Sequence, residues 1–193
     1  MHTIRDSSRR RAHAAAVTAC ALAVFTALTM LTGCSSDSKS DSSATTLPAA
    51  DCPFSGTIGD SSGGTAASEA LTMSSVASSK AGCIDEFQFN FEPTTGTWSA
   101  GYSTGPVTDA NGDTVAPPGA AQLVLTFNGA TYAQAGAAQA TIAAPNLDYV
   151  EGVTAAPGPN GALLVVIGLD KQRPYTASSS KAPAAYVTVG IGG

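Results

Sequence analysis

The sequence predicts an all-β protein that folds as an antiparallel β-sandwich with at most short helical turns. The clearest evidence is the segment 84–91, where Phe87, Phe89 and Phe91 alternate with polar residues, as in a strand with one buried face. Other short apolar or alternating segments are separated by turns that contain Gly and Pro, and no long helical pattern lies between them. Short strands at regular intervals are typical of an antiparallel sandwich or barrel.

Further segments are expected to supply the other strands. Residues 69–76 fit a strand or a short helix, and we interpret them as a strand. Residues 97–102 return after the turn at Pro93, so we expect them to pair with residues 84–91 as a hairpin. The apolar run 162–167 suits a strand that is covered on both faces. The remaining strands are expected at residues 122–127, 147–153 and 186–191.

Three segments between these strands lack a strand pattern. Residues 52–64 are rich in Gly and are expected to form a loop, and residues 105–119 form a long irregular link. The alanine-rich segment 133–140 is compatible with one or two turns of helix.

The first 33 residues have the composition of an export signal and are left out of the fold prediction. Four arginines precede an apolar run at residues 14–30, which is as long as a signal core and at the short limit for a spanning helix. The run ends at Leu31-Thr32-Gly33-Cys34, which resembles the lipobox of bacterial lipoproteins. That resemblance implies cleavage before Cys34 and lipidation of its thiol. An uncleaved transmembrane anchor is the alternative, and Sec and Tat export both fit the sequence.

Lipidation would hold the protein on the outer, extracytoplasmic face of the cell membrane. A lipoprotein cysteine carries two or three acyl chains, and each buried methylene contributes about 0.8 kcal/mol, so the anchoring would be stable. Residues 34–51 are rich in serine without apolar periodicity, and we expect a flexible tether. Residues 52–193 are long enough for one β domain with one core.

The charge of the chain disfavours nucleic acid as a partner. The chain contains 9 Lys and Arg and 14 Asp and Glu, and the first 33 residues hold four of the basic residues and one of the acidic ones. The part from Cys34 onward therefore has a net charge of −8. Binding to nucleic acid requires cations that displace the counterions of the phosphates.

The cysteines indicate one disulfide. Cys20 leaves with the signal and Cys34 takes the lipid, so Cys52 and Cys83 remain as one pair in an oxidising compartment. A metal site is the alternative, but two isolated cysteines without a histidine make a poor zinc site.

No motif in the sequence carries a complete catalytic set, so we expect a non-enzyme. Residues 101–105 match the G-x-S-x-G nucleophile elbow, but His2 and His13, the only histidines, leave with the signal. Residues 178–181 match S-x-x-K without its companion motifs, and we interpret them as a loop.

Asp109, Asn111 and Asp113 have the alternate spacing of a calcium loop. However, Gly112 is not at the sixth position, and Ala120 stands where the twelfth-position glutamate belongs. We interpret the loop as an Asn-Gly turn and leave weak calcium binding open. No other metal and no cofactor is expected.

Three stretches resemble the AMIN-like domain of actinobacterial lipoproteins, and the low charge and the Ala, Gly, Ser and Thr content fit such a secreted protein. They are residues 82–91 (GCIDEFQFNF), residues 109–115 with 119–125 (DANGDTV and GAAQLVL), and residues 166–170 with 173–175 (VIGLD and RPY). Their order and spacing cover nearly all of residues 83–191.

The resemblance implies a non-enzymatic β-sandwich related to the AMIN module, which in cell-wall amidases is a targeting domain that binds the envelope. Two features depart from the family pattern. Glu86 stands where many members have arginine, and residues 186–189 (YVTV) lack the acidic residue that often occurs in the last strand.

The candidate binding or structural residues are Asp85, Glu86, Arg173 and Tyr175. Asp85 and Glu86 are adjacent on a strand, so they point to opposite faces. Arg173 is the only arginine after the signal. It either forms a salt bridge to Asp85 or Glu86 that locks two strands, or presents its guanidinium to an anionic envelope group.

The function expected from these observations is that of a membrane-anchored module that binds peptidoglycan or envelope proteins. The alternative is a small carrier or receptor that holds an apolar ligand between its sheets.

Overall fold

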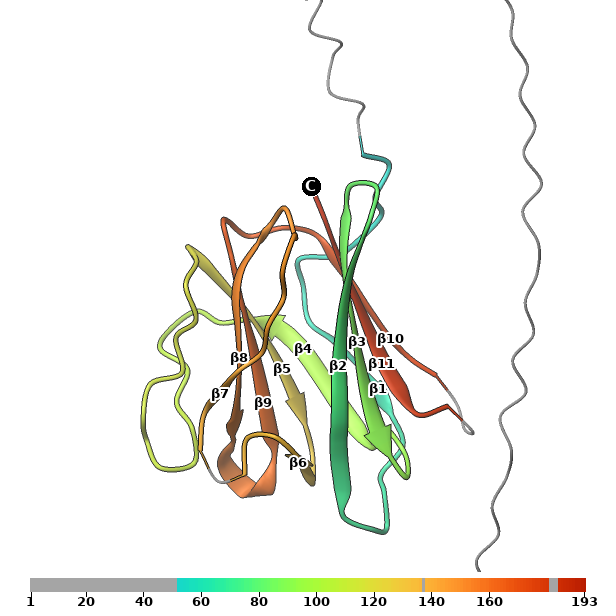
Figure 1. Cartoon of the computed structure of the whole chain (residues 1–193), viewed down its shortest axis with the longest axis vertical. Helices are drawn as coiled ribbons and strands as arrows, with labels where there is room; N and C mark the ends of the chain where they lie inside the picture. Colours follow the sequence, from blue (N-terminus) through green and yellow to red (C-terminus); the bar gives the residue numbers. More distant parts are fainter. Residues whose placement is uncertain (1–51, 137, 181–183) are drawn as a thin grey trace, which may run out of the picture. The chain divides into compact units, whose positions relative to one another are not determined.

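The computed structural model describes residues 52–136, 138–180 and 184–193, which form two β-sheets packed face to face (Figure 1). One sheet has six strands in the order β1-β4-β5-β9-β8-β7, and the other has five in the order β10-β11-β3-β2-β6. The six strands are β1 (Ser61–Gly64), β4 (Thr97–Tyr102), β5 (Ala121–Phe127), β9 (Leu163–Leu169), β8 (Val150–Pro157) and β7 (Ala140–Thr141). The five strands are β10 (Tyr175–Ser179), β11 (Tyr186–Gly192), β3 (Ile84–Glu92), β2 (Leu71–Ala81) and β6 (Ala130–Tyr132).

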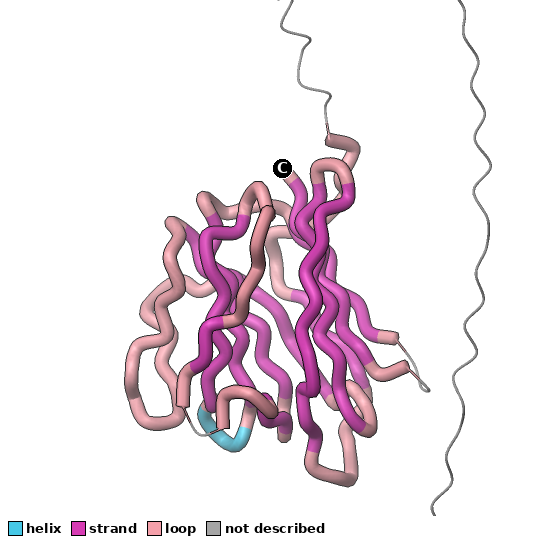
Figure 2. The backbone as a smooth tube through the Cα atoms, viewed as in Figure 1, coloured by secondary structure: helices cyan, strands magenta, loops and turns pink. Residues whose placement is uncertain are grey.

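The predicted all-β sandwich is confirmed. Every pairing of these strands is antiparallel except that of β2 with β6, which is parallel. Within the described residues the only helical element is a 3₁₀ turn at Pro159–Gly161 (Figure 2). None of the described helical segments is long and apolar enough to cross a membrane.

The core lies between the sheets and is filled from both sides by alternate residues. Phe87, Phe89 and Phe91 of β3 are buried, as the alternation in this segment predicts. They face β5 of the other sheet, and the rings of Phe91 and Phe127 lie 4.8 Å apart. Because burying one such side chain stabilises the fold by about 1.5–3 kcal/mol, this aromatic layer is a main source of cohesion between the sheets.

The predicted hairpin between residues 84–91 and 97–102 is wrong. β3 and β4 belong to different sheets, and the short connection that contains Pro93 crosses from one sheet to the other. A hairpin would place the apolar faces of both strands on the same side. Here Phe91 belongs to the five-stranded sheet and Trp98 to the six-stranded sheet. Both side chains are buried in the core between the sheets, so the two strands contribute to it from opposite sides.

The helical turns with which the sequence of residues 133–140 is compatible do not form in the described part of this segment. Residues 133–136 form turns, and β7 begins at Ala140. Gly136 has a φ of 58°, which is unsuited to a helix. The short strands β1, β6, β7 and β10 were not predicted. β2 is longer than the predicted strand at residues 69–76, and β8 is displaced from 147–153 toward the C-terminus.

The link at residues 105–119 packs against the outer face of the six-stranded sheet (Figure 1, left). Val115 is fully buried there against Ala156 of β8 and Val166 of β9. All seven residues of β9 are buried, which confirms the prediction of a strand covered on both faces. Gly168 allows this close cover, because a Cβ at that position would lie 1.8 Å from the carbonyl oxygen of Pro118.

The segment before β2 connects the two sheets. Cys52 is joined to Cys83 in the turn between β2 and β3, as predicted, with the Cα atoms 5.9 Å apart. Thr57 then pairs with Tyr175 of β10 through two backbone hydrogen bonds of 2.8 Å. The chain continues into β1, which pairs with β4 of the other sheet. Residues 52–64 thus form part of both layers rather than a free loop.

Candidate functional site: a polar groove and the residues around Arg173

Asp85 is a fully buried carboxylate that holds a loop of the opposite sheet. It lies near the start of β3 and is 0% exposed. Its oxygens accept the backbone N–H of Asp148 at 3.0 and 3.1 Å and that of Tyr149 at 2.8 Å. Charge-assisted bonds of this kind compensate for the loss of hydration of the buried charge. The Lys80 ammonium lies 2.6 Å from the Asp148 carboxylate and reinforces the same junction at the surface.

The Arg173 guanidinium pairs with Asp170, not with Asp85 or Glu86. Its Nε and Nη2 atoms donate to the two oxygens of Asp170, both at 2.7 Å. It also lies over the Tyr149 ring, 3.8 Å from the centroid. The predicted salt bridge is therefore wrong in its partner: Asp85 already accepts backbone N–H groups, and Glu86 lies on the opposite face of β3.

The ion pair changes the pKa values of both groups. The hydrogen bond from Arg173 lowers the pKa of Asp170 below its ordinary value, and the same bond raises the pKa of Arg173. The Arg173 side chain is only 11% exposed. The ion pair itself joins two residues of the connection between β9 and β10, and the contact with the Tyr149 ring links this connection to the segment before β8.

Tyr175 is also part of the framework. It is fully buried, and its hydroxyl lies 2.7 Å from the carbonyl oxygen of Gly59 and 2.8 Å from that of Ala100. The Tyr102 hydroxyl donates to the Arg173 carbonyl at 2.7 Å and accepts the Arg173 N–H at 2.9 Å. Burial raises the pKa of both phenols, so both remain protonated at neutral pH.

The structure places the other motifs in ordinary turns and strands. Ser103 of the elbow-like motif donates from its Oγ to the carbonyl oxygen of Gly105 and follows the end of β4. Ser178 and Ser179 lie in β10, which corrects the loop interpretation of these two residues, whereas Ser180 follows the strand and Lys181 is outside the described residues. The lipidation residue Cys34 is also outside them, as are the signal and the tether.

Asp109 occupies a turn that its own carboxylate stabilises. Oδ1 accepts the N–H of Asn111 at 2.8 Å and that of Asp113 at 2.9 Å, and Oδ2 accepts the side-chain amide of Gln139 at 3.1 Å. This is the Asn-Gly turn that the sequence predicts, with Gly112 at a φ of 87°. In the described residues, no three His, Cys, Asp or Glu side chains are grouped so that they could hold a metal ion.

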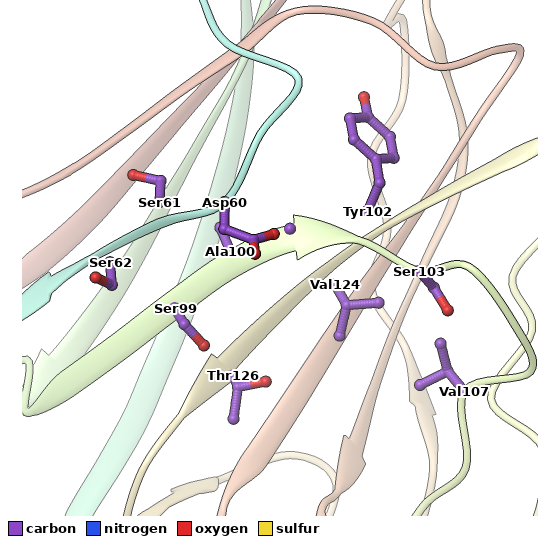
Figure 3. A pocket seen from close by; sticks show the side chains of 11 residues that line it. Asp60, Ser61, Ser62, Ser99, Ala100, Tyr102, Ser103, Val107, Val124 and Thr126 are labelled. Carbon is purple, nitrogen blue, oxygen red and sulfur yellow. The ribbon is translucent and has the colours of Figure 1, made fainter.

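A polar groove lies on the outer face of the six-stranded sheet, beside the part that residues 105–119 cover (Figure 3). Its volume is about 480 Å³, and it is open to solvent. Ser62, Ser99 and Thr126 lie in register on β1, β4 and β5, so their hydroxyls form one row across the strands. Asp60 and Val107 line the groove as well. These residues were not predicted from the sequence, although the outward alternation of residues 97–102 could have suggested Ser99.

A second hollow of about 440 Å³ lies where the 3₁₀ turn and the segment after β6 meet. Its lining is mainly apolar and includes Tyr132, Pro157, Pro159 and Leu163. None of the predicted residues Asp85, Glu86, Arg173 and Tyr175 lines either hollow. Asp85 and Arg173 both contact Tyr149. The backbone of Arg173 is hydrogen-bonded to the hydroxyl of Tyr102, which lines the polar groove.

The fold and these features define a β-sandwich domain with a surface groove and a buried framework of polar side chains. Residues 71–191 match the model of the AMIN-like domain, and the chain belongs to this family. The match extends from the first residue of β2 into β11, so it includes every described strand except β1. Neither a search of curated proteins nor a search of solved structures found a match.

Proposed function

We propose that this chain is a lipid-anchored extracytoplasmic protein whose AMIN-like domain binds the cell envelope without catalysing a reaction. The observation that carries the proposal is the family match, which accounts for nearly the whole sandwich. The related AMIN module of cell-wall amidases serves as a targeting domain. The binding target would be peptidoglycan or an envelope protein.

Two further observations support this proposal. The Cys52–Cys83 disulfide suits an oxidising compartment outside the cytoplasm. In addition, the buried polar groups that could have served chemistry are engaged in the framework: Asp85 accepts backbone N–H groups and Arg173 is paired with Asp170. This arrangement favours a rigid binding scaffold.

Binding is tested with residues 48–193, which contain all the described strands, the core and the disulfide. The oxidised domain is incubated with purified peptidoglycan and, separately, with solubilised envelope proteins. Saturable co-sedimentation with peptidoglycan, or recovery of one specific envelope protein, is expected. If neither occurs with a domain that is shown to be folded by circular dichroism, the proposed function fails.

The lipid anchor is tested in the full chain with Cys34→Ala, using Cys20→Ala as the matched control. The proposal expects wild type and Cys20→Ala to be processed and retained in the membrane fraction. Cys34→Ala should remain unprocessed or be released. Processing and membrane retention of Cys34→Ala at the wild-type level would contradict lipidation at this residue.

The hollow beside the 3₁₀ turn favours a second candidate function, the binding of an apolar ligand. Its volume and its mainly apolar lining fit a small hydrophobic molecule. The test is titration of residues 48–193 with a fluorescent apolar probe such as N-phenylnaphthylamine. Saturable fluorescence enhancement that Ala135→Trp abolishes would support this candidate, and enhancement that is absent or unsaturable would exclude it.

A further inference from the structure

We propose that the polar groove over β1, β4 and β5 binds an uncharged, hydroxyl-rich chain, that is, a neutral glycan. This inference rests on the proposed envelope-binding function and identifies the surface and the ligand chemistry. Three features of the groove support it: the hydroxyl row formed by Ser62, Ser99 and Thr126, the negative charge of the groove, and an apolar side next to that row.

The hydroxyl row provides repeated hydrogen-bonding positions. Ser62 is paired with Ser99, and Ser99 is paired with Thr126, so the three hydroxyls are carried by adjacent strands spaced about 4.8 Å apart. Each hydroxyl can donate one hydrogen bond and accept two. Within the described part of the chain, none of the three side chains has a hydrogen-bond partner. A polyol that lies across the strands would meet one such group at each strand.

Asp60 gives the groove a negative charge. Its carboxylate lies over Gly101 of β4, where a Cβ would be only 2.3 Å from Oδ1, and Figure 3 shows it directed toward this strand. No ion pair with Asp60 is found among the described residues, and the residues that line the groove include no Lys or Arg. The carboxylate can accept charge-assisted hydrogen bonds from sugar hydroxyls. It would repel an anionic polymer, so we assign a neutral glycan rather than a phosphate-rich or uronic acid polymer.

The groove also has an apolar side, which suits the C–H faces of sugar rings. Val107 from the 105–119 link and Val124 of β5 lie beside the hydroxyl row. Sugar rings present C–H faces between their hydroxyls, and these faces can pack on the valine side chains while the hydroxyls bond to Ser99 and Asp60. Because the groove is open rather than enclosed, it can admit the middle of a polymer.

Asp60 and Ser62 lie before the family match at residues 71–191. The groove therefore combines a sheet of the family domain with a wall supplied by the preceding segment. That segment is held in place by the disulfide and by the pairing of Thr57 with Tyr175. Loss of the wall should affect the groove while the core of the family domain stays intact.

The test measures binding of residues 48–193 to β-1,4-linked N-acetylglucosamine tetramer by calorimetry, with an oligogalacturonate as the anionic comparison. The groove variant is Ser99→Ile, and the matched control is Ser79→Ile, because both serines are exposed on strands of opposite sheets. We expect the tetramer to bind wild type and Ser79→Ile equally. Ser99→Ile should bind at least tenfold more weakly, and Asp60→Asn several-fold more weakly.

Several results would overturn the inference. They are no binding of the tetramer by wild type, stronger binding of the anionic glycan, and equal binding by Ser99→Ile and wild type. Peptidoglycan co-sedimentation separates these failures from failure of the proposed function. If the folded Ser99→Ile domain sediments with peptidoglycan like wild type, the groove assignment is wrong while envelope binding stands.

Discussion

The Asp85 carboxylate accepts the backbone N–H of Tyr149 at 2.8 Å, and this bond joins β3 of one sheet to the segment that enters β8 of the other. The Tyr149 ring then carries the Arg173 guanidinium on its face. Tyr149 thus contacts the buried Asp85 carboxylate through its backbone N–H and the Arg173 guanidinium through its ring. The junction explains why a charge that sits in the interior is compatible with a stable sandwich.

Replacing the buried Asp85 with Ala should destabilise the fold by about 3 kcal/mol, because two partly buried backbone N–H groups would lose their charged acceptor. Chemical denaturation measures the change in the free energy of unfolding. Glu86→Ala is the matched control, since the neighbouring side chain lies on the opposite face, and it should change stability by less than about 0.5 kcal/mol. Similar losses in both variants would contradict this role of Asp85.

The pair of Asp170 with Arg173 should make stability fall in acid. The hydrogen bond from Arg173 gives Asp170 a lower pKa in the folded state than its ordinary value, so its contribution is present above about pH 4 and is lost as the pH falls through the folded-state pKa. Urea midpoints between pH 7 and pH 2.5 measure this dependence. Asp170→Asn should show a shallower decline than wild type over the acidic part of the range. An unchanged slope would mean that the ion pair does not contribute.

Loss of the disulfide should lower the free energy of unfolding by roughly 3–4 kcal/mol, as the chain-entropy model gives for a closed loop of this length. The cysteines are 31 residues apart in sequence. The measurement compares wild type with Cys52→Ser/Cys83→Ser under oxidising conditions. Adding a reductant should destabilise wild type and leave the double variant unchanged. Equal stability of both proteins before reduction would contradict the prediction.

Gly168→Ala should displace the link at residues 105–119 from the sheet. The new Cβ would collide with the backbone of Pro118, so we expect a loss of at least about 2 kcal/mol. Gly105→Ala in the same link is the control, because a Cβ there meets no atom within 4 Å. Thermal unfolding of both variants tests the difference. If Gly168→Ala is as stable as Gly105→Ala, the close cover of β9 does not depend on this glycine.

The alternation of residues 84–91 was sufficient to predict β3 and its buried face, since period two has a direct structural meaning. The uninterrupted apolar run 162–167 likewise predicted β9 and its cover on both faces. The partner of β3 was not predictable in the same way. Local pattern does not specify which sheet the chain enters after Pro93, so the expected hairpin proved to be a crossing between layers.

The candidate site, like the partner of β3, could be predicted only in part, because local sequence pattern does not specify which segments lie side by side. The sequence indicated Asp85 and Arg173 as important, and both are central to the framework, but Arg173 pairs with Asp170 only three residues away. The groove was missed because its residues are small and polar, and Asp60 lies in a segment that appeared to be a loop. Ser62, Ser99 and Thr126 can be recognised as a candidate binding surface only from the pairing of β1, β4 and β5, which places them in one row.

The most direct test of the account is the fraction of the oxidised 48–193 domain that co-sediments with purified peptidoglycan, measured beside capture of solubilised envelope proteins. We expect saturable retention on the wall or recovery of one specific envelope protein. A folded domain that stays in the supernatant and captures no envelope protein would contradict the proposal that this AMIN-like domain is an envelope-binding module.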